Sequence, residues 1–155
     1  MKHLIGFNES IKYNWKFYED DFYELKDFCE TTLAYLLDED FHIEYVGKFG
    51  IRIIPISDNN FITVQLYGPL VKESDDTALI GSRYSTWYWN DVKDYYIPLI
   101  QLLKSRYRLS EYISFRVQTG RLETSLKSYT LEQVVNDKIE LDKPIFSISV
   151  EVKKL

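Results

Sequence analysis

Two kinds of apolar spacing alternate along this chain, and together they restrict it to a fold that mixes helices and strands. From Asp21 to about Leu37 apolar residues recur at steps of three and four, which predicts an amphipathic helix. Asp21 followed by Glu24 resembles a capping box at its start. Three segments then alternate or run apolar between turn residues, which predicts three strands: residues 41–45, 51–56 and 61–67.

The second half of the chain repeats this mixture. A second helix is expected from Ser85 or Asn90 to about Tyr107, with Pro98 either kinking it or starting a new segment. Thr130 and Gln133 form a capping box for a short helix to about Asn136. Two more strands are expected, at residues 112–117 and 145–150, and a long loop at residues 68–82.

The resulting order, α-β-β-β-α-β-α-β, predicts an α+β two-layer sandwich. We expect a five-stranded antiparallel or mixed sheet with the helices packed on one face. The length of 155 residues favours a single domain, residues 1–155, with residues 1–19 as an N-terminal extension packed on it. Pro55 cannot donate to a strand ladder, so its strand ends there or lies at an edge.

The side-chain inventory favours recognition over chemistry. The chain holds 25 aromatic residues but only two histidines and one cysteine. Aromatic residues dominate cores and binding surfaces, whereas His and Cys supply most metal ligands and many catalytic groups. Cys29 lies on the apolar stripe of the first helix, which indicates a buried structural thiol. No common catalytic or phosphate-binding motif occurs, so we expect a non-enzyme without metal or cofactor.

One aromatic segment is a candidate binding surface. Arg83 precedes Trp87, Tyr88 and Trp89, and Arg, Trp and Tyr are the residues that most often carry binding energy at interfaces. Trp89 is spaced as a core residue with respect to the helix that follows. The spacing leaves open whether Trp87 and Tyr88 lie in the core or on the surface.

Charge is distributed unevenly along the chain, whose net charge is −5. Residues 1–45 carry eleven acidic and four basic residues, and residues 104–127 carry six basic and two acidic ones. The acidic part predicts a helix face that could bind a basic partner, and the basic part an anion site. The acidic candidates are Glu19, Asp20, Glu24, Asp27 and Glu30. The basic candidates are Arg106, Arg116 and Arg121 from this stretch, together with Arg83 from the aromatic segment.

The first ten residues, Met-Lys-His-Leu-Ile-Gly-Phe-Asn-Glu-Ser, resemble the openings of small accessory proteins of large tailed bacteriophages. Phe7-Asn8-Glu9 is loosely similar to the cleavage motif of head-packaged internal proteins in such phages. The resemblance implies a viral accessory protein and supplies no site residues. Without a secretory leader or a membrane-length apolar run, the expected location is the host cytoplasm, or the virion for a structural part.

Three functions follow as hypotheses. The first is a non-catalytic phage-type accessory protein that binds a host or viral protein, for example as an inhibitor that uses the acidic helix face. The second is a binder of a small anionic ligand such as a nucleotide, held by arginines beside an aromatic ring. The third is a structural virion component, for which homo-oligomerisation is expected. Non-specific nucleic-acid binding is disfavoured by the sequence pI of about 5.1.

Overall fold

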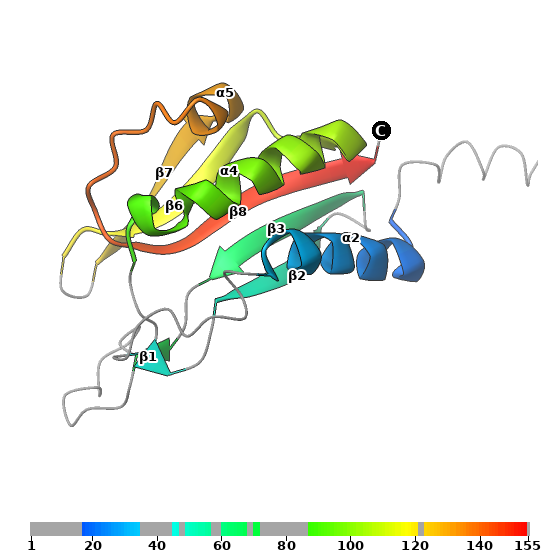
Figure 1. Ribbon diagram of the computed structural model, residues 1–155, viewed down its shortest axis with the longest axis horizontal. Coiled ribbons are helices and arrows are strands. Elements are labelled where there is room, and N and C mark those ends of the chain that lie inside the picture. The colour runs from blue at the N-terminus through cyan, green and yellow to red at the C-terminus, as the bar shows by residue number, and fades with distance from the viewer. Residues whose placement is uncertain are drawn as a thin grey trace, which may run out of the picture.

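The computed structural model describes residues 17–34, 45–46, 49–56, 60–67, 70–71, 87–120 and 123–154. The elements in chain order are α2 (Glu19–Thr32), β1 (Tyr45–Val46), β2 (Gly50–Ile56), β3 (Phe61–Tyr67), β4 (Leu70–Val71), α4 (Trp89–Arg106), β5 (Tyr107–Leu109), β6 (Tyr112–Gln118), β7 (Thr124–Thr130), α5 (Leu131–Val135) and β8 (Ile145–Lys154) (Figure 1). The α+β class is confirmed.

A six-stranded sheet forms the larger layer. Its strand order is β2-β3-β8-β6-β7, with β5 also paired to β8, and every pairing is antiparallel. β1 and β4 pair separately as a two-stranded sheet. The large sheet contains four of the predicted strands, as β2, β3, β6 and β8, together with two that the sequence pattern does not predict, β5 and β7.

The C-terminal strand β8 lies at the centre of the sheet. On one side it pairs with β3, from Ile62 opposite Val152 to Tyr67 opposite Ser147. On the other side β5 and β6 follow one another along it. Among the described strands, β2 pairs only with β3, and β7 only with β6, so two hairpins are joined through the last of these strands, β8.

An irregular step separates β5 from β6. The pairing register along β8 shifts between Leu109 and Ser114, which leaves extra residues on the β5–β6 side, as in a bulge. Ser110 repairs the ladder there: its N–H donates to the carbonyl of Glu151 at 2.9 Å, and its hydroxyl accepts from the N–H of Glu151 at 3.2 Å. One continuous line of pairing along β8 is thereby preserved.

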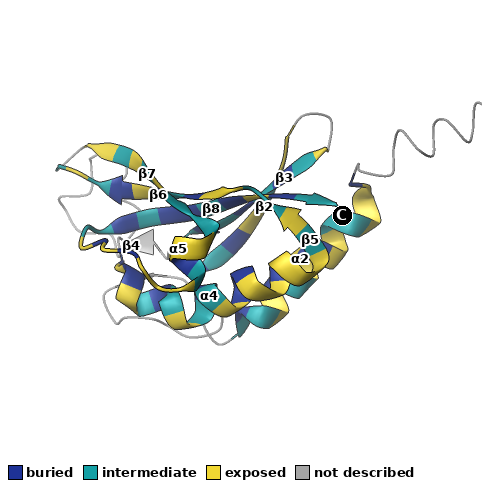
Figure 2. Ribbon diagram, turned by 90° about the horizontal axis from the view of Figure 1, so that it is seen from above, coloured by how far each residue is buried: buried dark blue, intermediate teal, exposed yellow. Residues whose placement is uncertain are grey.

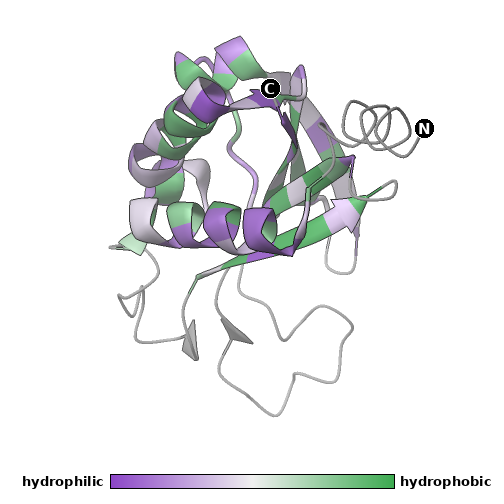
Figure 3. Cartoon of the chain, turned by 90° about the vertical axis from the view of Figure 1, so that its right-hand side faces the viewer, coloured by the Kyte–Doolittle hydropathy of each residue, from purple (hydrophilic) through white to green (hydrophobic). Residues whose placement is uncertain are grey.

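The helices lie over one face of the sheet (Figure 2). Alternate residues of β3, β6 and β8 point toward the helices and are buried, including Val64, Phe115 and Val150. α2 contributes Leu25 and Cys29 to the same core, and Leu33, the residue that caps its C-terminus, is buried beside them. α4 contributes Trp89, Val92, Tyr96, Leu99, Ile100 and Leu103. Hydrophobic and hydrophilic segments alternate along both helices, as amphipathic packing requires (Figure 3).

Both long helices begin within one turn of the predicted starts but at different residues. The cap residue is Tyr18 for α2 and Tyr88 for α4. The N–H of Tyr18 donates to the carboxylate of Asp21 at 2.7 Å, and that of Tyr88 to Asp91 at 2.8 Å. Asp21 is therefore the third helical residue and not the cap, and Asn90 lies inside α4. A polar cap accepts from the N–H groups of the second or third helical residue, whereas a carboxylate at the third position accepts from the N–H of the cap residue itself. Acidic residues near a helix start therefore indicate the region without identifying its first residue.

The remaining differences also have local causes. α4 continues across Pro98 as one helix. Pro98 has no N–H to donate to the carbonyl of Asp94, four residues earlier, and both residues lie on the exposed side of the helix. β7 escaped prediction because its half-exposed Ser, Thr and Lys residues give little apolar signal. The predicted strand at 41–45 and loop at 68–82 lie mostly outside the described residues, as does the extension before residue 17.

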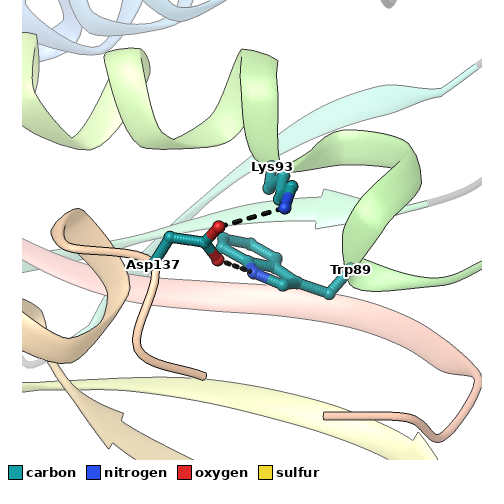
Figure 4. Close-up of polar contacts among 3 residues, drawn as sticks. All are labelled: Trp89, Lys93 and Asp137. Carbon is teal, nitrogen blue, oxygen red and sulfur yellow. Dashed lines mark hydrogen bonds and ion pairs between the residues drawn. The ribbon is translucent and has the colours of Figure 1, made fainter. Parts of the chain in front are cut away.

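Asp137 ties α4 to the end of α5. It adopts a left-handed conformation (φ 51°), and the N–H groups of Asp137 and Lys138 bond to the carbonyls of Val134 and Gln133, which is the Schellman pattern. Its carboxylate accepts from the indole N–H of Trp89 at 2.9 Å and from Lys93 Nζ at 3.0 Å (Figure 4). These two hydrogen bonds lower the pKa of Asp137.

Replacing Asp137 tests this connection. We expect Asp137→Ala to lower the free energy of unfolding by about 2 kcal/mol, because the indole of Trp89 loses its acceptor and Ala is strained in the left-handed region. Asp137→Asn keeps an acceptor and tolerates that conformation, so its loss should be about half as large. Urea unfolding at pH 7 measures both, with Glu140→Ala as the exposed control. Equal losses for Ala and Asn would instead assign the stabilisation to the Lys93 ion pair.

Candidate functional site

The solvent side of α2 forms an acidic surface. Its buried residues, Leu25 and Cys29, and the buried C-cap residue Leu33 are four residues apart and fix which side of the helix faces the core. The opposite side exposes one basic residue, Lys26, whose Nζ lies 3.9 Å from a carboxylate oxygen of Glu30. The residues that define the acidic α2 surface are Glu19, Asp20, Glu24, Asp27 and Glu30, all exposed.

A mostly apolar groove runs beside this surface, between α2 and the edge strand β2. Its volume is about 330 Å³. Phe22, Tyr23, Ile53 and Pro55 supply its apolar lining, and Glu19 and Lys26 complete the rim. A second hollow of about 450 Å³ continues from Tyr23 along the acidic residues Glu24, Asp27 and Glu30. Apolar and acidic binding elements are therefore contiguous on one side of the molecule.

An ion pair fixes the N-terminal end of α2 to the sheet. Lys154 Nζ lies 2.6 Å from the carboxylate of Asp21, and both side chains are partly buried. Burial alone would raise the pKa of Asp21, but the hydrogen bonds from Lys154 and from the N–H of Tyr18 outweigh it, and the pKa is lowered. The ammonium of Lys154 also lies 5.3 Å from the ring centroid of Tyr18. The acidic surface is thus held by the last strand of the chain.

Cys29 is a core residue beneath this surface, as its position on the apolar stripe predicts. It is fully buried, and burial together with the nearby Glu30 charge raises the pKa of its thiol to about 12. The thiolate, which is the nucleophile, is therefore not populated at neutral pH. Tyr96, whose phenol is also fully buried, has its pKa raised by burial and then by Cys29.

The aromatic segment divides between core and surface. Trp87 is 1% exposed, so its candidacy as a surface contact is wrong. The backbone of Trp87 forms an isolated antiparallel bridge with Ile145, the first residue of β8. Its indole packs against the ring of Phe49, with the ring centroids 5.3 Å apart, and this contact helps to bury it. Trp89 is buried as predicted, Tyr88 is 49% exposed, and Arg83 lies outside the described residues.

The two candidate arginines that the structure describes, Arg106 and Arg116, do not form one pocket. The guanidinium of Arg106 lies 4.4 Å from the ring centroid of Phe28, in the helical layer. Arg116 lies on the opposite face of the sheet, where it donates to the hydroxyl of Thr124 at 3.2 Å. Arg121 is outside the described residues. A nucleotide pocket built on Arg106 and Arg116 together is therefore excluded by their separation across the sheet.

Within the described part of the chain, no three His, Cys, Asp or Glu side chains gather as metal ligands. None of the described helices is long and apolar enough to cross a membrane. Comparison with protein-family models, curated proteins and solved structures found no match.

Sequence reasoning identified the acidic residues but missed the groove. Glu24, Asp27 and Glu30 share a helix face that periodicity reveals. Ile53 and Pro55 reach the site from a strand more than twenty positions away, and no local pattern connects them with Phe22 and Tyr23. The sequence also did not predict that Tyr23 is exposed, as 65% of it is, because an aromatic residue next to Phe22 could equally well belong to the core.

Asp21→Asn tests how α2 is held. Because the folded-state pKa of Asp21 is lowered, its charge stabilises the fold above the unfolded-state pKa of about 4, and this contribution is lost as pH falls through the folded-state value. We expect Asp21→Asn to cost about 1 kcal/mol at pH 7 and almost nothing near pH 2. Urea unfolding across that pH range measures the difference. Asp27→Asn, in the middle of the exposed side, is the control, and an equal loss there would contradict the assignment.

Proposed function

We propose that this protein is a non-catalytic binding protein of the phage accessory type, and that it docks on a basic surface of a host or viral protein through α2. The observation that carries the proposal is the contiguity of the apolar α2–β2 groove with the acidic α2 surface. A partner segment with apolar residues on one side and Lys or Arg beside them would match both elements at once.

The groove supplies the apolar half of such an interface. Phe22 and Tyr23 come from α2, and Ile53 and Pro55 from β2, so two packed elements hold the walls in place. Tyr23 combines a large ring, 65% exposed, with a polar tip, a type of residue that is enriched among binding hot spots. An apolar side chain inserted here would remove both itself and the ring of Tyr23 from water.

The acidic residues supply long-range attraction and help to orient the partner. Five exposed carboxylates face outward from one helix, and Lys26 is the one basic residue exposed among them. Surface potentials of this kind accelerate association with an oppositely charged partner, and salt weakens them. Toward an enzyme that handles DNA or RNA, such a row of carboxylates would occupy the basic channel that normally receives phosphates.

A defined probe tests the proposal: a synthetic helical peptide with leucines on one side and lysines on the other, titrated into the isotope-labelled protein and followed by NMR. We expect resonance shifts along α2 and β2, and an affinity that falls about tenfold or more between 50 and 500 mM salt. The triple variant Glu24→Lys, Asp27→Lys, Glu30→Lys should abolish binding, and Ile53→Ser should weaken it.

The matched control reverses three exposed acids elsewhere, Glu132, Glu140 and Asp142. It changes the net charge by the same amount but leaves α2 intact, so the peptide should still bind. If both triple variants lost peptide binding equally, the attraction would come from the net charge of the protein and not from the acidic α2 surface. Binding that salt does not change would contradict an acidic docking surface.

A further inference from the structure

The face of the sheet turned away from the helices has its own side-chain set, which the pairing registers define. Among the described residues no helix lies over this face (Figure 2). Directly paired residues of antiparallel strands share a face. One row therefore runs Gly50, Tyr67, Ser147, Arg116, Leu126, and the next runs Arg52, Gln65, Ser149, Ser114, Ser128. We call this surface the open sheet face.

The open sheet face is positively charged although the chain as a whole is negative. Arg52 and Arg116 belong to the two rows above. Two more cations lie on the same face farther along the sheet: Lys153 of β8 and its partner Arg108 of β5. Glu151 is the one acidic residue that the registers of the described strands place on this face. Four cations against one carboxylate, in a protein of net charge −5, concentrate positive charge on a single surface.

Aromatic rings lie among these cations. The guanidinium of Arg52 is 5.1 Å from the ring centroid of Tyr67, and Lys153 Nζ is 4.0 Å from that of Phe61. Tyr67 lies against Gly50, where a Cβ would come within 2.3 Å of the ring, so the glycine leaves space for the ring to lie over β2. Tyr112 is 52% exposed and comes from the same side of β6 as Ser114 and Arg116.

Short polar side chains fill the centre. Gln65, Ser149, Ser114 and Ser128 stand in one row across four strands and offer hydroxyl and amide groups without bulk. At about 4.8 Å between strands, the five strands of a row span about 19 Å, which is wide enough for a few nucleotides. A flat row of small hydrogen-bonding residues lets an extended chain lie close to the sheet.

We propose that the open sheet face binds single-stranded nucleic acid, with phosphates on its four cations, Arg52, Arg108, Arg116 and Lys153. Unpaired bases would stack on the exposed ring of Tyr112 and on the half-buried rings of Phe61 and Tyr67. Cations that follow a backbone and rings on which bases stack are the two components of single-strand recognition. An acidic peptide would use the cations and leave the rings unexplained. A duplex keeps its bases stacked inside and cannot use them.

This surface is distinct from the protein-docking surface proposed above. The acidic α2 surface belongs to the helical layer, and the open sheet face belongs to the other side of the sheet (Figure 2). Phosphates bound on the sheet therefore do not meet the row of carboxylates on α2. A chain with both surfaces connects a basic protein to a single strand, and either interaction can exist without the other.

Fluorescence anisotropy with labelled 20-nucleotide dT and U strands tests the proposal, with the same-length duplex as comparison. For four cations on phosphates, the slope of log K against log salt should approach about −2.8. Arg116→Ala should flatten it by about 0.7, and Tyr67→Ala should weaken binding on the order of tenfold. Tyr67→Phe keeps the ring and should bind like the unmodified protein.

Lys104→Ala is the matched control, because it removes one exposed cation from α4 and should leave the slope unchanged. If Tyr67→Ala fails to fold, Arg52→Ala and Arg116→Ala carry the test alone. No binding to either strand at 50 mM salt overturns the proposal, as does equal affinity for the duplex. Sedimentation that shows Arg116-dependent self-association without nucleic acid would instead assign this face to contacts between copies.

Discussion

The pairing of β8 with both halves of the sheet is the constraint on which the rest of the structure depends. The β2–β3 and β6–β7 hairpins can each form locally, but each needs β8 to join the other. β8 buries Ile145, Ile148, Val150 and Val152 against the helices, so its insertion completes the core as well as the sheet. It also carries Lys154, which anchors α2 through Asp21. The acidic α2 surface and the open sheet face therefore both depend on β8 being in place.

The two layers of the sandwich carry charge of opposite sign. α2 exposes a row of carboxylates, whereas the open sheet face presents four cations and one carboxylate. Between them lies a hydrophobic core, in which, among the described residues, the phenol of Tyr96 and the indole N–H of Trp87 are buried without a hydrogen-bond partner. Because the layers face opposite directions, each surface can attract a different partner without cancelling the other's field. This opposite polarity supports the proposal that the two surfaces bind different partners.

Much of the fold could be read from periodicity, and the errors lie where tertiary contacts replace local signals. The strand Phe61–Tyr67 and the Thr130 capping box appear as predicted, because strict alternation and a side-chain cap are local features. β7 was missed since its outer face is polar, and Trp87 was left undecided since its burial depends on pairing with Ile145, far along the chain. Of the candidate site residues, the α2 carboxylates share one face as predicted, whereas Arg106 and Arg116 lie on opposite layers.

The sequence by itself determined the α+β class, the amphipathic faces of α2 and α4, the burial of Cys29 and the acidic character of α2, because each depends on residues within a few turns or strand positions of one another. Only the tertiary structure decided the strand order, the α2–β2 groove, and the gathering of Arg52, Arg116 and Lys153 on one face. Those features depend on registers between strands distant in the chain. Within a hairpin the turn can set the register, but between β8 and its neighbours β3 and β6 the register depends on how the apolar faces of distant segments pack together.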